Sequence, residues 1–257
     1  MTDRPLAVIT GAGRGIGREI ALSFSSAGYT VVLAARSVEE LKAVEGEVSD
    51  GGGQAWVVPT DLREEADVEQ LVLEAQERGS VEALVNNSGI AGPSGVLWEM
   101  DLKQWEETMA VNVTGVFLCC RGFLPGMIER GRGSIINIGS ITGKRPLFGR
   151  TPYATSKMAL VGLTRTLAFE AGRYGIRVNL ISPGFVAGPR IERVIAMQAE
   201  AREVDPEEVR AEFEEESPLG RLTLPEEVAR TAVFLASEAA NGITGADINV
   251  NAGVVMY

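Results

Sequence analysis

Histidine is absent from this chain of 257 residues. Its absence excludes Ser-His-Asp and Cys-His catalysis, histidine-ligated zinc and acid–base catalysis by imidazole. Any chemistry must therefore use tyrosine, lysine, serine, asparagine or carboxylate side chains. We predict no metal site in this sequence.

Basic residues are also scarce. The chain has 24 lysines and arginines against 35 aspartates and glutamates, which gives a net charge of -11 and a pI of about 4.7. Nucleic acids and anionic membrane surfaces need a basic face, so we expect neither as a partner. No apolar run approaches the roughly 18 residues of a membrane span. The start, Met1–Pro5, is too short and wrongly shaped for a signal peptide.

Cysteine is limited to the neighbours Cys119 and Cys120. In a helical stretch, adjacent side chains point in different directions and cannot bridge easily. We therefore expect buried, reduced thiols and a cytoplasmic protein. The apolar fraction of 45% is ordinary for a globular protein, and the chain is long enough for a packed core.

Short β-branched runs alternate with longer amphipathic runs along the chain. Several of the short runs are apolar throughout, as expected of strands covered on both faces. The alternation predicts one α/β domain over residues 1–257, with a doubly wound, seven-stranded, mainly parallel sheet and helices on both faces. The expected strands are Leu6–Thr10, Thr30–Ala35, Gln54–Pro59, Ala83–Asn86, Ser134–Ile138, Arg177–Ser182 and Asp247–Val250. The expected helices are Ile16–Ala27, Val38–Ser49, Glu64–Arg78, Leu102–Arg130, Tyr153–Tyr174, Ile191–Glu216 and Pro225–Ser237.

A segment of about residues 185–216 interrupts the alternation and is rich in glutamate. A helical insert there would lie over the carboxyl ends of the strands, where such sheets bind their ligands, and could serve as a substrate lid. The alternative is a solvated acidic face.

Tyr153 and Lys157 are four residues apart in an expected helix, so they share one face. A lysine ammonium beside a phenol favours the phenolate and lowers the pKa of the tyrosine toward neutral. Such a tyrosine can pass a proton to or from a reacting oxygen. The pair therefore indicates a catalytic site for proton transfer.

A glycine-rich turn, Thr10–Gly17, follows the first expected strand and opens a helix. Glycines there allow a tight turn and let backbone N–H groups approach a pyrophosphate at the helix N-terminus. The spacing departs from G-x-G-x-x-G, whose third glycine would fall on Ile16. A plain corner between strand and helix is the alternative. The glycines of the turn that would contact the cofactor are Gly11, Gly15 and Gly17.

Arg36 follows the second expected strand, where NAD enzymes place a carboxylate for the ribose 2′-hydroxyl. The first acid here is Glu39. Arg36 could instead bind a 2′-phosphate, with Arg14 as a second donor, so the sequence favours NADP over NAD. Two solvated arginines are the alternative. Asp61, after the third strand, could accept a hydrogen bond from adenine or act as a helix N-cap.

These motifs together resemble the short-chain dehydrogenases/reductases, in the family's order over nearly the whole chain. The resemblance implies a Rossmann fold and hydride transfer between a nicotinamide cofactor and a carbonyl or secondary alcohol. Two positions depart from the family pattern, namely Ser88, where alanine is usual, and Gly188, where threonine commonly binds the carboxamide. The matching residues are Thr10–Gly17, Asp61, Asn86–Gly89, Asn112, Ser140, Tyr153, Lys157 and Pro183-Gly184.

The resemblance also implies a role for each residue. Tyr153 would be the general acid in reduction, and Lys157 would lower its pKa and hold the nicotinamide ribose. Ser140 would polarise the substrate oxygen. Asn112 would complete a water relay to Lys157. The implied cofactor contacts are Gly11, Arg14, Gly15, Ile16, Gly17, Arg36, Asp61, Leu62, Asn87, Ser88, Gly89, Tyr153, Lys157, Pro183, Gly184 and Val186.

The substrate stays open at this point. The chain resembles 3-oxoacyl-carrier-protein reductases and also polyol and sugar dehydrogenases, which would use NAD. A non-catalytic dinucleotide-binding scaffold is a third alternative, although it would not need all four catalytic residues. Lys144, Arg145 and Arg150 could attract an anionic group of a small-molecule substrate, or could simply be solvated.

Assembly is the last feature that the resemblance implies. The family usually forms homotetramers, and the long helices around Trp105–Arg130 and Tyr153–Tyr174 would supply the interface, with a dimer as the alternative. The apolar chain end, Val254–Tyr257, could dock at another interface or be a free tail.

Overall fold

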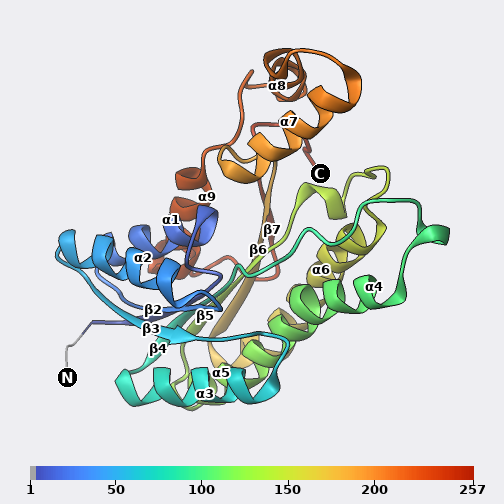
Figure 1. Cartoon of the computed structure of the whole chain (residues 1–257). Coiled ribbons are helices and arrows are strands. Elements are labelled where there is room, and N and C mark those ends of the chain that lie inside the picture. Colours follow the sequence, from blue (N-terminus) through green and yellow to red (C-terminus); the bar gives the residue numbers. More distant parts are fainter. Residues whose placement is uncertain (1–3) are drawn as a thin grey trace.

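The computed structural model describes residues 4–257 and is built around one seven-stranded sheet (Figure 1). The strand order is β3-β2-β1-β4-β5-β6-β7, and every neighbouring pair is parallel, which confirms the predicted doubly wound α/β fold. Residues 1–3, part of the start that was compared with a signal peptide, lie outside the described residues. The strands are β1 (Leu6–Thr10), β2 (Thr30–Ala35), β3 (Gln54–Pro59), β4 (Val81–Asn86), β5 (Gly133–Ile138), β6 (Ile176–Pro183) and β7 (Asp247–Val250).

Helices cover both faces of the sheet (Figure 1). Helices α1, α2 and α9 lie on one face, and α3, α5 and α6 lie on the other. Two further helices, α7 and α8, project beyond the carboxyl ends of the strands. The helices are α1 (Gly15–Ser26), α2 (Val38–Asp50), α3 (Glu65–Arg78), α4 (Leu102–Met109), α5 (Gly115–Arg130), α6 (Thr151–Ala171), α7 (Pro189–Arg202), α8 (Pro206–Glu215) and α9 (Pro225–Ala236).

The apolar strand sequences divide between two cores because successive side chains point to opposite faces. In β1, Leu6 and Val8 join the core under α3, α5 and α6, whereas Ala7 and Ile9 join the core under α1, α2 and α9. All of β1 is buried. A central strand that is apolar at every position therefore follows directly from burial on both faces.

The predicted helix over Leu102–Arg130 is interrupted, which corrects the sequence analysis. Helix α4 ends at Met109, a π-helical turn spans Ala110–Thr114, and α5 begins at Gly115. The extra residue of a π-turn rotates the following side chains, and such turns are frequent at functional sites. Here the turn carries Asn112, which is fully buried.

The same helical stretch, Leu102–Arg130, has the length and composition of a membrane-spanning helix, with a mean hydropathy of 1.4. It is not an uninterrupted apolar run, because Arg121 lies within it. One such helix among the described residues is weak evidence for a span, and 44% of the window is buried inside the protein. Its side chains at Val116 and Phe123 belong to the core against the sheet. Helices of a protein core pass the same test of length and composition.

The predicted helix over Ile191–Glu216 is in fact two helices, α7 and α8. The chain leaves α7 at Glu203, whose φ of 54° is left-handed, and α8 begins after Asp205, whose side chain accepts from the N–H of Glu207. Aspartate followed by Pro206 is a strong signal for a helix start. Together the two helices enclose a third, small apolar cluster built on Ile191, Ile195, Ala199, Val209 and Leu222.

Candidate active site

The site lies where the strand order reverses between β1 and β4. The connections from these two strands leave in opposite directions, which opens a crevice at their carboxyl ends. Thr10, at the end of β1, ties the two sides of this crevice together. Its Oγ1 accepts from the N–H groups of Asn87 (3.0 Å) and Ser88 (3.1 Å), and Asn87 Nδ2 donates to the Thr10 carbonyl (3.0 Å).

At Gly17 the glycine-rich turn is packed too tightly for a side chain. A Cβ on Gly17 would lie 2.0 Å from the carbonyl oxygen of Gly11 and 2.5 Å from Asn87 Nδ2. Gly11 and Gly15 have φ angles of 65° and 54°, which other residues rarely adopt. The turn is therefore shaped by close backbone approach, as a pyrophosphate-binding turn must be.

The start of α1 offers backbone donors to an anion. Arg14 is its N-cap residue and supplies no side-chain cap, while the Ile16 side chain packs onto the core. A helix N-terminus of this kind suits a dinucleotide pyrophosphate. The Arg14 guanidinium is exposed and pairs with Glu40 at 3.2 Å, a surface contact worth about 0–1 kcal/mol.

Arg36 follows β2, and Asp61 and Leu62 follow the neighbouring strand β3. Arg36 is exposed and has no carboxylate partner among the ion pairs of residues 4–257. Asp61 instead pairs with Arg63 at 2.5 Å, and this hydrogen bond holds the pKa of Asp61 below its usual range. The N-cap of α3 is Glu64, so the N-cap interpretation of Asp61 is wrong. Leu62 is buried.

Lys157 is almost completely buried beneath Tyr153. Its exposed fraction is 4%, and its Nζ donates to the Ile138 carbonyl at 2.8 Å, at the end of β5. The same Nζ lies 5.8 Å from the centroid of the Tyr153 ring. Burial lowers the pKa of the Lys157 ammonium, whereas the charge of a Tyr153 phenolate acts to raise it. The four-residue spacing on α6 thus brings an ammonium and a phenol together, as their shared helix face requires.

Tyr153 has cations on more than one side. Burial acts to raise the pKa of Tyr153, but the charges of Lys157 and Arg190, with hydrogen bonding to Ser140 and Arg190, outweigh burial and hold that pKa below its ordinary value. The guanidinium carbons of Arg190 and Arg150 each lie 5.4 Å from the ring centroid. Arg190 was not among the predicted site residues, and its position at the start of α7 is the only signal for it.

Asn112 is held inside the crevice by the loop after β4. Its Oδ1 accepts from the N–H of Ile90 (2.8 Å), and its Nδ2 donates to the Ile90 carbonyl and to Ser156 Oγ (both 3.0 Å). A Cβ on Gly89 would lie 3.3 Å from both Asn112 Oδ1 and Lys157 Nζ. Asn112 and Lys157 therefore face the same point of the backbone.

Ser140 and the end of β6 close the other side of the crevice. Ser140 follows β5 and its Oγ accepts from the N–H of Thr142 at 3.1 Å. Pro183 is buried at the end of β6, and Gly184 is packed so closely that a Cβ would lie 2.7 Å from the Asn251 Cβ. Val186 forms a single parallel bridge with Thr223.

Gly188 caps the start of α7 with a φ of 134°, a conformation that threonine rarely adopts. Glycine at this position therefore suits the backbone that leads into α7. Two residues further on, Arg190 reaches Tyr153.

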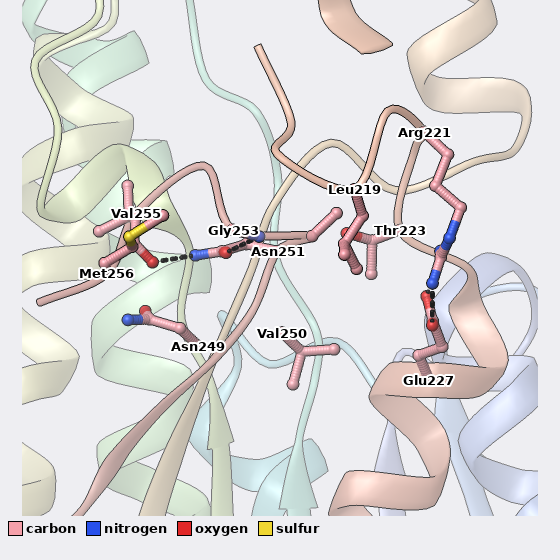
Figure 2. Close-up of a pocket in the computed structure, with 11 residues that line it drawn as sticks. Leu219, Arg221, Thr223, Glu227, Asn249, Val250, Asn251, Gly253, Val255 and Met256 are labelled. Carbon is pink, nitrogen blue, oxygen red and sulfur yellow. Dashed lines mark hydrogen bonds and ion pairs between the residues drawn. The ribbon is translucent and has the colours of Figure 1, made fainter. Parts of the chain in front are cut away.

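A cavity of about 410 Å³ lies beside this region, between the chain end and the start of α9 (Figure 2). The Arg221–Glu227 ion pair borders it, and the buried Oγ1 of Thr223 has no hydrogen-bond partner in the part of the chain that the structure describes. None of the four predicted catalytic residues lines it. The lining residues are Leu219, Arg221, Thr223, Glu227, Asn249, Val250, Asn251, Ala252, Gly253, Val255 and Met256.

Known proteins resemble this chain over nearly its whole length. A family model described as enoyl-(acyl carrier protein) reductase matches residues 11–255. The 3-oxoacyl-[acyl-carrier-protein] reductase FabG of Aquifex aeolicus is 37% identical, over 97% of this chain and 96% of that protein. A solved structure of a tryptophan variant of actinorhodin polyketide ketoreductase with NADPH is 36% identical, with a TM-score of 0.95 over 99% of this chain and 98% of that one.

A solved structure described as a putative gluconate dehydrogenase from Agrobacterium tumefaciens is also similar, at 30% identity and a TM-score of 0.90 over 99% of this chain and 97% of that one. The chain belongs to the short-chain dehydrogenase/reductase family of NAD(P)-dependent oxidoreductases.

Proposed function

We propose that this chain reduces a ketone with NADPH and that Tyr153 donates the proton to the carbonyl oxygen. The observation that carries the proposal is the half-buried phenol of Tyr153 surrounded by Lys157, Arg190 and Ser140. Bound NADPH would supply the hydride for the carbonyl carbon. The cations stabilise the phenolate that remains, and Ser140 holds the substrate oxygen as charge develops. Asn112 positions a water that returns a proton toward Lys157.

Four groups of residues would hold the cofactor. The backbone of the glycine-rich turn and the start of α1 suit the pyrophosphate, as the close approach of Gly17 to Gly11 supports. Asn87, Ser88 and Gly89 would lie under the cofactor, and Pro183, Gly184 and Val186 would lie near the nicotinamide. Arg36, with Arg14, would bind the 2′-phosphate, which favours NADP.

The names of the relatives indicate a class of substrate and no single compound. The relative from Aquifex aeolicus is named a 3-oxoacyl-[acyl-carrier-protein] reductase, and we propose that this chain likewise reduces an oxo group. An NAD-linked dehydrogenase of polyols or sugar acids is the second candidate, because one solved relative is described as a putative gluconate dehydrogenase. In both cases α7 and α8 would form the lid.

Replacing the proton donor tests the reaction. Tyr153→Phe removes the hydroxyl and should lower kcat by about 100-fold or more, because general acid catalysis contributes that much. NADPH oxidation with a panel of oxoacyl thioesters, diketones and keto sugars is measured by absorbance, and NADPH binding by fluorescence. Tyr174→Phe, outside the site, serves as the matched control. A Tyr153 variant that keeps full activity contradicts the proposal.

Reversing the charge after β2 tests the choice of cofactor. Arg36→Asp should raise the KM for NADPH about tenfold or more and lower that for NADH, because a carboxylate repels the 2′-phosphate and accepts from a 2′-hydroxyl. Arg132→Asp, at the opposite end of the strands, is the control and should change neither KM. An unchanged preference for NADPH in Arg36→Asp would contradict the assignment of Arg36 to the 2′-phosphate.

We also propose a homotetramer, supported by apolar side chains that α5 and α6 leave exposed. Phe169 is 90% exposed, and Phe117 and Met158 are about half exposed. Exposed apolar patches of this kind mark interaction sites. A cytoplasmic location and the absence of nucleic-acid and membrane partners stay predictions, and the two free, buried thiols of Cys119 and Cys120 fit a reducing compartment.

Phe169→Glu should therefore shift the protein from a tetramer to a smaller species, because it places a charge in the apolar interface. Light scattering after size exclusion measures the mass. Leu73→Glu, at an exposed apolar residue of α3, is the matched control. A wild-type monomer, or a Phe169 variant with unchanged mass, refutes the interface.

A further inference from the structure

Two arginines from distant parts of the chain meet at the Tyr153 ring. Arg150 directly precedes α6, whereas Arg190 lies in the first turn of α7. Their guanidinium carbons are both 5.4 Å from the ring centroid. Both guanidinium groups therefore lie close to the ring of the proposed proton donor.

Neither arginine is neutralised by a carboxylate within residues 4–257, unlike the neighbouring cations. Lys144, whose side chain is 9% exposed, pairs with Asp247 at 2.9 Å. Arg145 pairs with Glu216 at 2.8 Å. Of the three cations that the sequence singled out for an anionic group, only Arg150 thus keeps an uncompensated charge.

Arg150 is held in place by neutral groups. Its Nη1 donates to Ser94 Oγ and its Nη2 to the Ala91 carbonyl, both at 2.8 Å. The Gly95 N–H donates to the Gly149 carbonyl at 3.0 Å and joins the two loops. A guanidinium has five N–H donors, so three remain for a ligand. The positive charge of Arg190 is close enough to add to burial in lowering the pKa of Arg150.

The local charge is opposite to that of the whole chain. Acidic residues outnumber basic ones by 35 to 24, yet Arg150, Lys157 and Arg190 surround Tyr153 without an acidic side chain among the contacts that the structure describes there. Like charges held together at a half-buried site repel one another, and a bound anion relieves that repulsion. Guanidinium groups bind carboxylates in bidentate geometry.

We propose that Arg150 and Arg190 form an anion subsite beside the reacting carbonyl, and that the substrate is an oxo acid whose carboxylate lies a few bonds from that carbonyl. This inference rests on the proposed reduction and names its substrate class. The pyrophosphate of the cofactor is a different anion, and the glycine-rich turn already suits it. The contacts of Arg150 are with the loop after β4 and with Tyr153 instead.

A matched pair of ketones tests the subsite. We compare 4-oxopentanoate with its methyl ester, which differs in lacking the carboxylate charge, as kcat/KM with NADPH. Wild-type protein should favour the acid, and Arg150→Met and Arg190→Met should each lower the acid-to-ester ratio about tenfold or more. Any change in the pKa of Tyr153 affects both ketones and cancels in the ratio. Arg145→Met, already paired in the same loop, is the control and should keep the wild-type ratio.

Three results would overturn the subsite. The first is a wild-type preference for the ester, and the second is an acid-to-ester ratio that stays unchanged in both variants. The third is weaker NADPH binding in Arg190→Met at an unchanged acid-to-ester ratio, which would assign this arginine to the cofactor. If neither ketone is reduced, the proposed reduction fails for this pair, and calorimetric titration of both ketones into protein saturated with NADP⁺ still decides the subsite. Tighter binding of the acid that is lost in Arg150→Met supports it, and equal binding of acid and ester overturns it.

Discussion

The positive charge of buried Lys157 beside Tyr153 is the interaction on which the site depends. Burying an ammonium is costly unless it has hydrogen-bond partners. The structure supplies one such partner, the Ile138 carbonyl at 2.8 Å, where β5 ends. Sheet and helix are thus both needed, because β5 fixes the acceptor and α6 fixes the lysine and tyrosine on one face. The family's Tyr-x-x-x-Lys spacing follows from this arrangement.

The parallel sheet gathers the remaining groups at one edge. Thr10 joins the ends of β1 and β4, and the π-turn rotates Asn112 toward the loop after β4. Arg190 connects α7 to the same phenol. Movement of α7 would therefore change both the access to Tyr153 and its charge environment, which links the lid to the chemistry through one side chain.

Periodicity was enough to predict the sheet, whose strands begin and end within two residues of expectation, because buried parallel strands are apolar throughout. It could not reveal the π-turn at Ala110–Thr114, because one extra residue barely alters the apolar pattern. The break before α8 did have a signal, Asp205 followed by Pro206, which was overlooked. Arg190 was missed because its partner Tyr153 is distant in sequence and only the fold brings them together.

The most direct test of this account is the ionisation of Tyr153 itself. Phenolate absorbance is followed as a function of pH in wild-type protein and in Tyr153→Phe, and the difference isolates one of the four tyrosines. The account predicts a phenolate that forms below the ordinary tyrosine pKa of about 10. Replacing Arg190 by methionine removes a cation and should move this titration to higher pH. A Tyr153 that ionises at or above the ordinary value would contradict the account.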